Sequence, residues 1–183
     1  MPTVRVKDIN MYYELHGSGT PLVHVGGLAG DARAWARQIQ WLSQHFQVLC
    51  FDNRGTGRTD CPDQLYSTKL FAEDTLGLMD ALGIERAHLY GISMGGCIVQ
   101  EAAIAHPERV ISLTINCSFA KLDRYGSRIC ENLIGVYKAQ GAREKSQRHR
   151  AHITHEYACR MKIENQKSRG SSGDAEVRTK CRL

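Results

Sequence analysis

The stretch HLYGISMGGCIVQ, residues 88–100, decides the fold because it sets a Gly-x-Ser-x-Gly motif between an apolar run and a helical one. An apolar run ending in glycine predicts a buried strand, and the periodicity after Ser93 predicts a helix. Gly91 and Gly95 flank the serine, and residues this small let a strand and a helix approach closely around a tight, strained turn. Such a turn raises the hydroxyl at the positive end of a helix, so Ser93 is a candidate nucleophile.

The chain up to about residue 140 alternates predicted strands and helices after an initial hairpin at 3–17 that turns at Asp8-Ile9-Asn10. Further strands are predicted at 21–27, 47–51, 87–93 and 109–118, and helices at 31–46, 70–83, 94–106 and 127–141. This alternation predicts an α/β fold with a mostly parallel sheet and helices on both faces. Ser93, the Gly26-Gly27 pair and Asp52 each follow a strand, where ligands bind in such sheets.

Composition is that of an ordinary globular protein, with 183 residues, 42% of them hydrophobic and 23% charged. No apolar run approaches the roughly 18 residues of a membrane span, and the N-terminal residues contain no apolar segment typical of a secretory signal. The seven cysteines form no Cys-x-x-Cys pair, which favours reduced thiols. We therefore expect a cytoplasmic protein that does not bind membranes.

The charge of the chain is concentrated at its C-terminal end. Residues 1–142 contain 13 Lys/Arg and 14 Asp/Glu, whereas residues 143–183 contain 11 and 5. The apolar periodicity is lost at the same point, and the SRGSSGDAE stretch is typical of a flexible segment. We interpret 1–142 as the folded core and 143–183 as a polar, basic, irregular tail.

The tail also contains residue types that could ligate a metal: His149, His152, His155, Glu156 and Cys159. Several arginines lie among them, and their repulsion disfavours a bound cation. The basic residues have no interleaved aromatic side chains and belong to no recognisable nucleic-acid-binding motif. We expect no metal, no cofactor and no nucleic-acid partner.

Two further stretches, DNRGTGRTD (52–60) and PLVHVGGLAGDARAW (21–35), accompany the serine motif. Together the three resemble the α/β-hydrolase family over residues 1 to about 142, in the family's order and spacing. The resemblance is to the esterase, enol-lactonase and C–C hydrolase group, and it implies a small-molecule, ester-like substrate. It also implies that the last strands of the family's sheet are missing after the sixth.

By resemblance, the backbone N–H groups of Met94 and Leu28 would form the oxyanion hole. The family usually has His-Gly where this chain has Gly26-Gly27, so the loop lacks its usual side-chain anchor. We interpret His24, two residues earlier, as a strand-end histidine with a local hydrogen bond. Asp52 and Arg54 are interpreted as structural residues that hold the turn and its neighbouring loops.

A serine hydroxyl needs a histidine to take its proton and a carboxylate to orient that histidine. In the family the order is serine, acid, histidine, and some members carry the acid after the sixth strand, which makes Asp123 the candidate acid. The histidine would then be His149, His152 or His155. The segment 127–142 is interpreted as the start of a helical cap over the site.

Two interpretations of the C-terminal segment remain open: an interruption of a family protein near residue 142, or a divergent polar cap. Interruption would leave the strand at 109–118 as an exposed sheet edge and favour self-association. Two functions remain open as well. One is a serine hydrolase acting through Ser93 on a small ester, enol-lactone or C–C bond; the other is a non-catalytic remnant or binding module.

Overall fold

The computed structural model describes residues 2–121, 124–126, 128, 132, 163–165 and 179–181. The chain divides into two compact units. The first comprises Met1–Pro62 and Thr68–Phe119, and the second comprises Asp63–Ser67 and Ala120–Leu183. The serine motif and the two stretches that accompany it all lie in the first unit.

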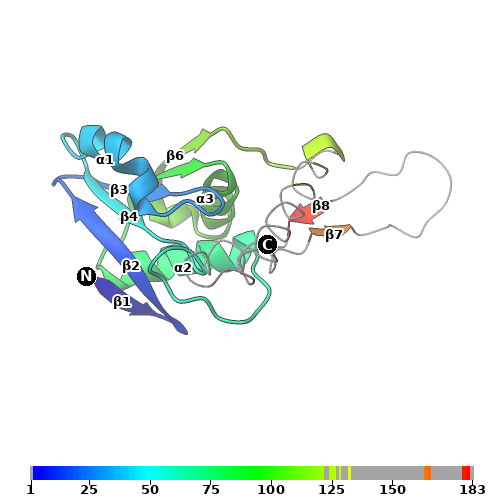
Figure 1. Ribbon diagram of the computed structural model, residues 1–183. Helices are drawn as coiled ribbons and strands as arrows, with labels where there is room; N and C mark the ends of the chain where they lie inside the picture. The colour runs from blue at the N-terminus through cyan, green and yellow to red at the C-terminus, as the bar shows by residue number, and fades with distance from the viewer. Residues whose placement is uncertain are drawn as a thin grey trace. The chain divides into compact units, whose positions relative to one another are not determined.

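The elements of the first unit follow the predicted alternation (Figure 1). In chain order they are β1 (Thr3–Val6), β2 (Ile9–His16), β3 (Pro21–Val25), the 3-10 turn η1 (Ala32–Trp35), α1 (Ala36–Leu42), β4 (Gln47–Phe51), α2 (Thr68–Ala81), β5 (Ala87–Ile92), α3 (Met94–Ala105), the 3-10 turn η2 (Pro107–Arg109) and β6 (Val110–Asn116).

The six strands form one sheet in the order β1-β2-β4-β3-β5-β6. β1 pairs antiparallel with β2, and β2 pairs antiparallel with β4. The remaining pairs, β4 with β3, β3 with β5 and β5 with β6, are parallel. The prediction of an α/β fold with a mostly parallel sheet is confirmed.

The hairpin turn differs from the prediction. Val6 pairs with Ile9, so the turn consists of Lys7 and Asp8 and does not extend to Asn10. Lys7 has φ of 51°, which is the backbone conformation that tight two-residue hairpin turns require. The geometry of the two-residue turn therefore fixes the register of β1 against β2, whereas composition alone suggested a turn at Asp8-Ile9-Asn10.

Helices cover both faces of the sheet, as predicted. On one face, Leu22 of β3 and Val48 and Cys50 of β4 pack in a buried cluster with Ile39 of α1. On the other face, a Cβ at Gly91 would lie 2.6 Å from Val99 of α3. Since alternate residues of a strand point to opposite faces, α1 covers one face and α3 the other.

The predicted helix at 31–46 is split. Asp31 caps the 3-10 turn η1 by accepting a hydrogen bond from the backbone N–H of Arg33, and α1 begins only at Ala36. Trp35, the last residue of η1, has φ of −109° and ψ of 8°, which is outside the helical range. The helix predicted at 70–83 begins earlier, at Thr68, and is followed by Gly83 at φ of 69°.

β6 forms one end of the six-stranded sheet. Its Ile111, Leu113 and Ile115 are 42%, 38% and 45% exposed, although they lie on the face covered by α3. Such an edge can accept another strand. The self-association expected of this edge stays a prediction.

The second unit contains β7 (Ile163–Asn165) and β8 (Thr179–Cys181), which pair antiparallel. Strands of three residues are too short to show an alternating pattern, so the sequence does not predict them. The helix predicted at 127–141 lies for the most part outside the described residues. Within the described part of the chain, no helix has the length and apolarity needed to cross a membrane.

Candidate active site around Ser93

Ser93 lies between β5 and α3 in a strained backbone conformation. Its φ of 54° and ψ of −121° are unfavourable for a residue with a Cβ, and strain of this kind concentrates at functional sites. The backbone N–H of Ser93 donates to the carbonyl of Asn116 at 3.0 Å, which ties the turn to the end of β6. The side chain is exposed and does not cap α3. The hydroxyl is therefore accessible.

The two glycines of the motif make this turn possible through close packing. A Cβ at Gly95 would lie 2.1 Å from the carbonyl oxygen of Val25, so the first turn of α3 lies directly against the end of β3. A Cβ at Gly91 would lie 2.3 Å from the carbonyl oxygen of Gly95. Any side chain at either position would separate β3, β5 and α3.

The loop after β3 lies against Ser93. A Cβ built at Gly27 would be 3.2 Å from Ser93 Cβ and 3.6 Å from Ser93 Oγ. Leu28 follows Gly27 in a turn closed by a hydrogen bond from the N–H of Gly30 to the carbonyl of Gly27, at 3.3 Å. Met94 follows Ser93 as the first residue of α3. Leu28 and Met94, the two residues predicted to form the oxyanion hole, thus directly follow Gly27 and Ser93, which lie close together.

Asp52, at the end of β4, is fully buried and connects two loops. Its Oδ1 accepts from the backbone N–H of Ala32 at 2.8 Å, and its Oδ2 accepts from the backbone N–H and the Nε of Arg58, both at 2.8 Å. Asp52 therefore joins the segment after the Gly27 loop to the loop at 52–60.

Arg54 is also fully buried, between two carboxylates. Its Nε and Nη2 donate to both oxygens of Asp74 at 2.7 Å, and its Nη1 and Nη2 donate to both oxygens of Asp8 at 2.8 Å. Burial alone would lower the pKa of Arg54, but the hydrogen bonds to Asp74 and Asp8 outweigh it and raise the pKa. The hydrogen bond from Arg54 lowers the pKa of Asp8 to about 2.

His24 does not form the local hydrogen bond that the sequence suggested. Neither ring nitrogen has a hydrogen-bond partner among the described residues, although the residue is only 1% exposed. The imidazole instead lies between the rings of Trp35 and Tyr90, with centroids 5.2 and 5.0 Å away. Because these rings, from η1 and the neighbouring strand β5, help to bury the imidazole, its pKa is lowered to about 4.

This burial predicts a pH dependence of stability. The pKa of about 4 in the folded state lies below the ordinary value of 6.5, so the unfolded chain takes up a proton first as the pH falls. His24 should therefore lower the free energy of unfolding progressively between pH 6.5 and 4, by at most about 3 kcal/mol. Denaturant unfolding at several pH values should show that the free energy of unfolding of His24→Phe falls less steeply between pH 6.5 and 4. The exposed control His45→Gln should show the same fall as the parent protein. An unchanged fall in His24→Phe would contradict the assignment of this pH dependence to His24.

One residue that the sequence analysis missed supports the Gly27 loop. Asn53 Nδ2 donates to the carbonyl of Gly26 at 3.3 Å, and Asn53 is buried. A side-chain anchor for this loop thus exists, and it comes from the residue after Asp52. The only signal in the sequence was the polar Asp-Asn-Arg run directly after a strand.

The other predicted members of the site lie outside the described residues. They are the candidate acid Asp123, the candidate bases His149, His152 and His155, and the weighed metal ligands Glu156 and Cys159.

A family model described as the alpha/beta hydrolase fold matches residues 20–157. The chain belongs to this family. The resemblance drawn from the three sequence motifs is confirmed, and the strained serine turn, the Gly27 loop and the strand order occur in a member of the α/β-hydrolase family.

Individual hydrolases and a lactone-degrading enzyme also match. RutD of Azorhizobium caulinodans, named a carbamate hydrolase, is 40% identical over 141 residues, which are 77% of this chain and 53% of that protein. The structure of CumD, a meta-cleavage product hydrolase of Pseudomonas fluorescens IP01, is 28% identical with a TM-score of 0.65, covering 68% of this chain and 47% of that one. Est816, an N-acyl homoserine lactone degrading enzyme, is 29% identical with a TM-score of 0.65, covering 87% and 64%. The chain spans about half the length of the curated relatives it matches.

Proposed function

We propose that this protein is a serine hydrolase that attacks the carbonyl carbon of a small substrate with Ser93. The observation that carries the proposal is the strained, exposed Ser93 between β5 and α3, so close to Gly27 that a Cβ built there would lie 3.2 Å from Ser93 Cβ. A strained backbone of this kind is retained when the surrounding packing imposes it. Here Gly91 and Gly95 supply that packing.

The backbone N–H groups of Met94 and Leu28 are proposed to bind the oxyanion. Met94 begins α3, where the positive end of the helix dipole favours negative charge. Leu28 follows Gly27, whose position lies within van der Waals distance of Ser93. Each such donor typically contributes about 3–4 kcal/mol to transition-state stabilisation.

The proposed substrate class is a small carboxylic ester, an enol-lactone or a compound cleaved at a C–C bond. The names of the relatives support this range, since carbamates and lactones both contain a carbonyl carbon that a serine hydroxyl can attack. CumD, a meta-cleavage product hydrolase, supports the C–C alternative.

Asp123 is proposed as the acid, and His149, His152 or His155 as the base. Residues 127–142 are proposed to begin a cap, before the tail at 143–183.

Covalent labelling tests this proposal. A fluorophosphonate probe should label the full chain and an exposed-serine control, Ser18→Ala, but not Ser93→Ala. Turnover of a p-nitrophenyl ester should fall by about 10³-fold or more in Ser93→Ala, because the hydroxyl proposed to form the acyl intermediate is removed. A folded protein that the probe does not label would instead support the alternative of a non-catalytic remnant or binding module.

A further inference from the structure

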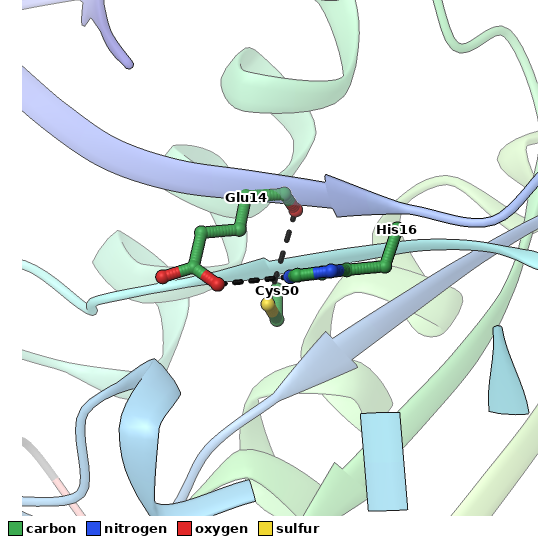
Figure 2. A group of neighbouring side chains, drawn as sticks. All are labelled: Glu14, His16 and Cys50. Carbon is green, nitrogen blue, oxygen red and sulfur yellow. Dashed lines mark hydrogen bonds and ion pairs between the residues drawn. The ribbon is translucent and has the colours of Figure 1, made fainter. Parts of the chain in front are cut away.

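Three potential metal ligands, Glu14, His16 and Cys50, lie together on the sheet, apart from the serine motif (Figure 2). His16 Nε2 and Glu14 Oε2 are 2.8 Å apart, and Cys50 Sγ is 3.8 Å from the backbone carbonyl oxygen of Glu14. One ligand atom from each residue, a carboxylate oxygen, an imidazole nitrogen and the thiol sulfur, lies within 4.8 Å of the other two. Figure 2 shows the carboxylate and the imidazole turned toward each other, with the Cys50 side chain beside the gap between them.

Strand pairing brings these residues together. Glu14 of β2 pairs directly with Cys50 of β4, so their side chains leave the sheet on the same face. His16 lies two residues beyond Glu14 on the same strand, and therefore on that same face. The backbone of a two-stranded ladder thus holds all three ligands, and a site built on strands is more rigid than one on loops.

The three ligands differ in exposure in a way that suits an ion bound at the edge of the core. Cys50 is 1% exposed and packs in the apolar cluster with Leu22, Val48 and Ile39. The side chains of His16 and Glu14 are 41% and 28% exposed. An ion could therefore enter past His16 and Glu14 and reach the sulfur from the solvent side.

The neighbouring charges are compatible with a divalent cation. Arg58 Nη1 approaches Glu14 Oε1 at 3.5 Å, but the guanidinium of Arg58 is paired with the buried Asp52. Glu14, Asp52 and a Cys50 thiolate supply three negative charges against the one positive charge of Arg58. The net charge of −2 around the site therefore balances the charge of a divalent cation.

We propose that Glu14, His16 and Cys50 bind a divalent ion of the Zn²⁺ class, with water as a fourth ligand. A tetrahedral site places oxygen, nitrogen and sulfur ligands about 2.0–2.3 Å from Zn²⁺, and so about 3.4–3.6 Å from one another. The observed separations, from 2.8 Å to within 4.8 Å, bracket this spacing. The mixed oxygen, nitrogen and sulfur set selects Zn²⁺ and similar borderline metals over Mg²⁺ or Ca²⁺.

Cys50 is not suited to act alone as a nucleophile. Burial, followed by the charges of Glu14 and Asp52, raises the pKa of its thiol to about 12. A thiol with so high a pKa is mostly protonated and unreactive at neutral pH.

Titration of the metal-free full chain with Co²⁺ tests the site, because a thiolate ligand produces a sulfur-to-cobalt charge-transfer band in the near ultraviolet. The band should appear in the parent protein and disappear when Zn²⁺ is added. In His16→Gln and in Cys50→Ser, the affinity for Co²⁺ should fall by about 100-fold or more. The matched controls His45→Gln and Cys117→Ser, both at exposed positions, should keep the band.

His16→Gln decides the outcome even if Cys50→Ser fails to fold, because His16 is partly exposed and replacing it leaves the buried cluster intact. A band of unchanged strength and affinity in His16→Gln would overturn the proposal, and so would a parent protein with no band. A triple variant of His149, His152 and His155 to Gln should keep the band. Its loss there would place the ion in the C-terminal segment and overturn the site at Glu14.

Discussion

Arg54→Ala is expected to lower the free energy of unfolding by about 3–5 kcal/mol, because it leaves the carboxylate of Asp74 buried without a partner. Asp74 is 1% exposed, and both of its oxygens accept hydrogen bonds from Arg54. Asp8, the second partner of Arg54, is half exposed and can regain water. Denaturant unfolding with the slope m held constant measures the change.

Arg33→Ala is the matched control for this prediction. Arg33 pairs with Asp31, but its side chain is 75% exposed, so its removal should change stability by less than about 1 kcal/mol. In a second control, Arg54→Met combined with Asp74→Leu should recover much of the loss, because neither charge is then buried alone. Equal effects of Arg54→Ala and Arg33→Ala would show that the buried ion pair does not hold the loop at 52–60.

Gly95→Ala is expected to destabilise the protein by about 3 kcal/mol or more and to abolish labelling of Ser93. The added Cβ would lie 2.1 Å from the carbonyl oxygen of Val25 and 2.7 Å from that of Gly26. Gly95 is within α3, so alanine suits its backbone and only the lack of space opposes it. Relief of the contact requires α3 to move away from β3, which separates Ser93 from the Gly27 loop.

Gly77→Ala supplies the control, since Gly77 also lies inside a helix, α2. Among the described residues, its Cβ would approach Val6 Cγ1, at 2.8 Å, which is a side-chain atom of a buried valine and not a backbone carbonyl. Higher helix propensity should offset part of the cost of that contact, so Gly77→Ala should destabilise the protein less than Gly95→Ala does and should keep the labelling of Ser93. Thermal unfolding and fluorophosphonate labelling measure both variants. Full labelling of Gly95→Ala would contradict the packing assigned to the serine turn.

The path of the chain around Ser93 could be predicted because each signal there is local. The apolar run of β5, the two glycines and the periodicity of α3 are contiguous in sequence, and they specify a strand, a tight turn and a helix without reference to distant residues. The strand at β3 with its glycine loop is defined in the same way. The prediction missed the turn at Lys7–Asp8 and the break at Trp35, because these depend on backbone torsions that composition does not specify.

The partners of the polar side chains could not be predicted. Arg54 lies between Asp8 and Asp74, which are distant from it in the chain, and nothing in the sequence indicates which acids it contacts. The same holds for Asn53, whose side chain anchors Gly26, and for His24, which lies between two aromatic rings: the sequence does not indicate their partners. Each contact joins separate elements, so it exists only once those elements pack together.

The sequence by itself determined that this protein belongs to the α/β-hydrolase family and that Ser93 lies in a tight turn, because a strand–turn–helix motif depends on neighbouring residues alone. Only the tertiary structure decided which groups surround that turn, and which others meet elsewhere. Glu14 and His16 lie far from Cys50 in the chain, and the register of β2 against β4 brings them to one face of the sheet. Register is a property of paired strands, and no single stretch of sequence contains it.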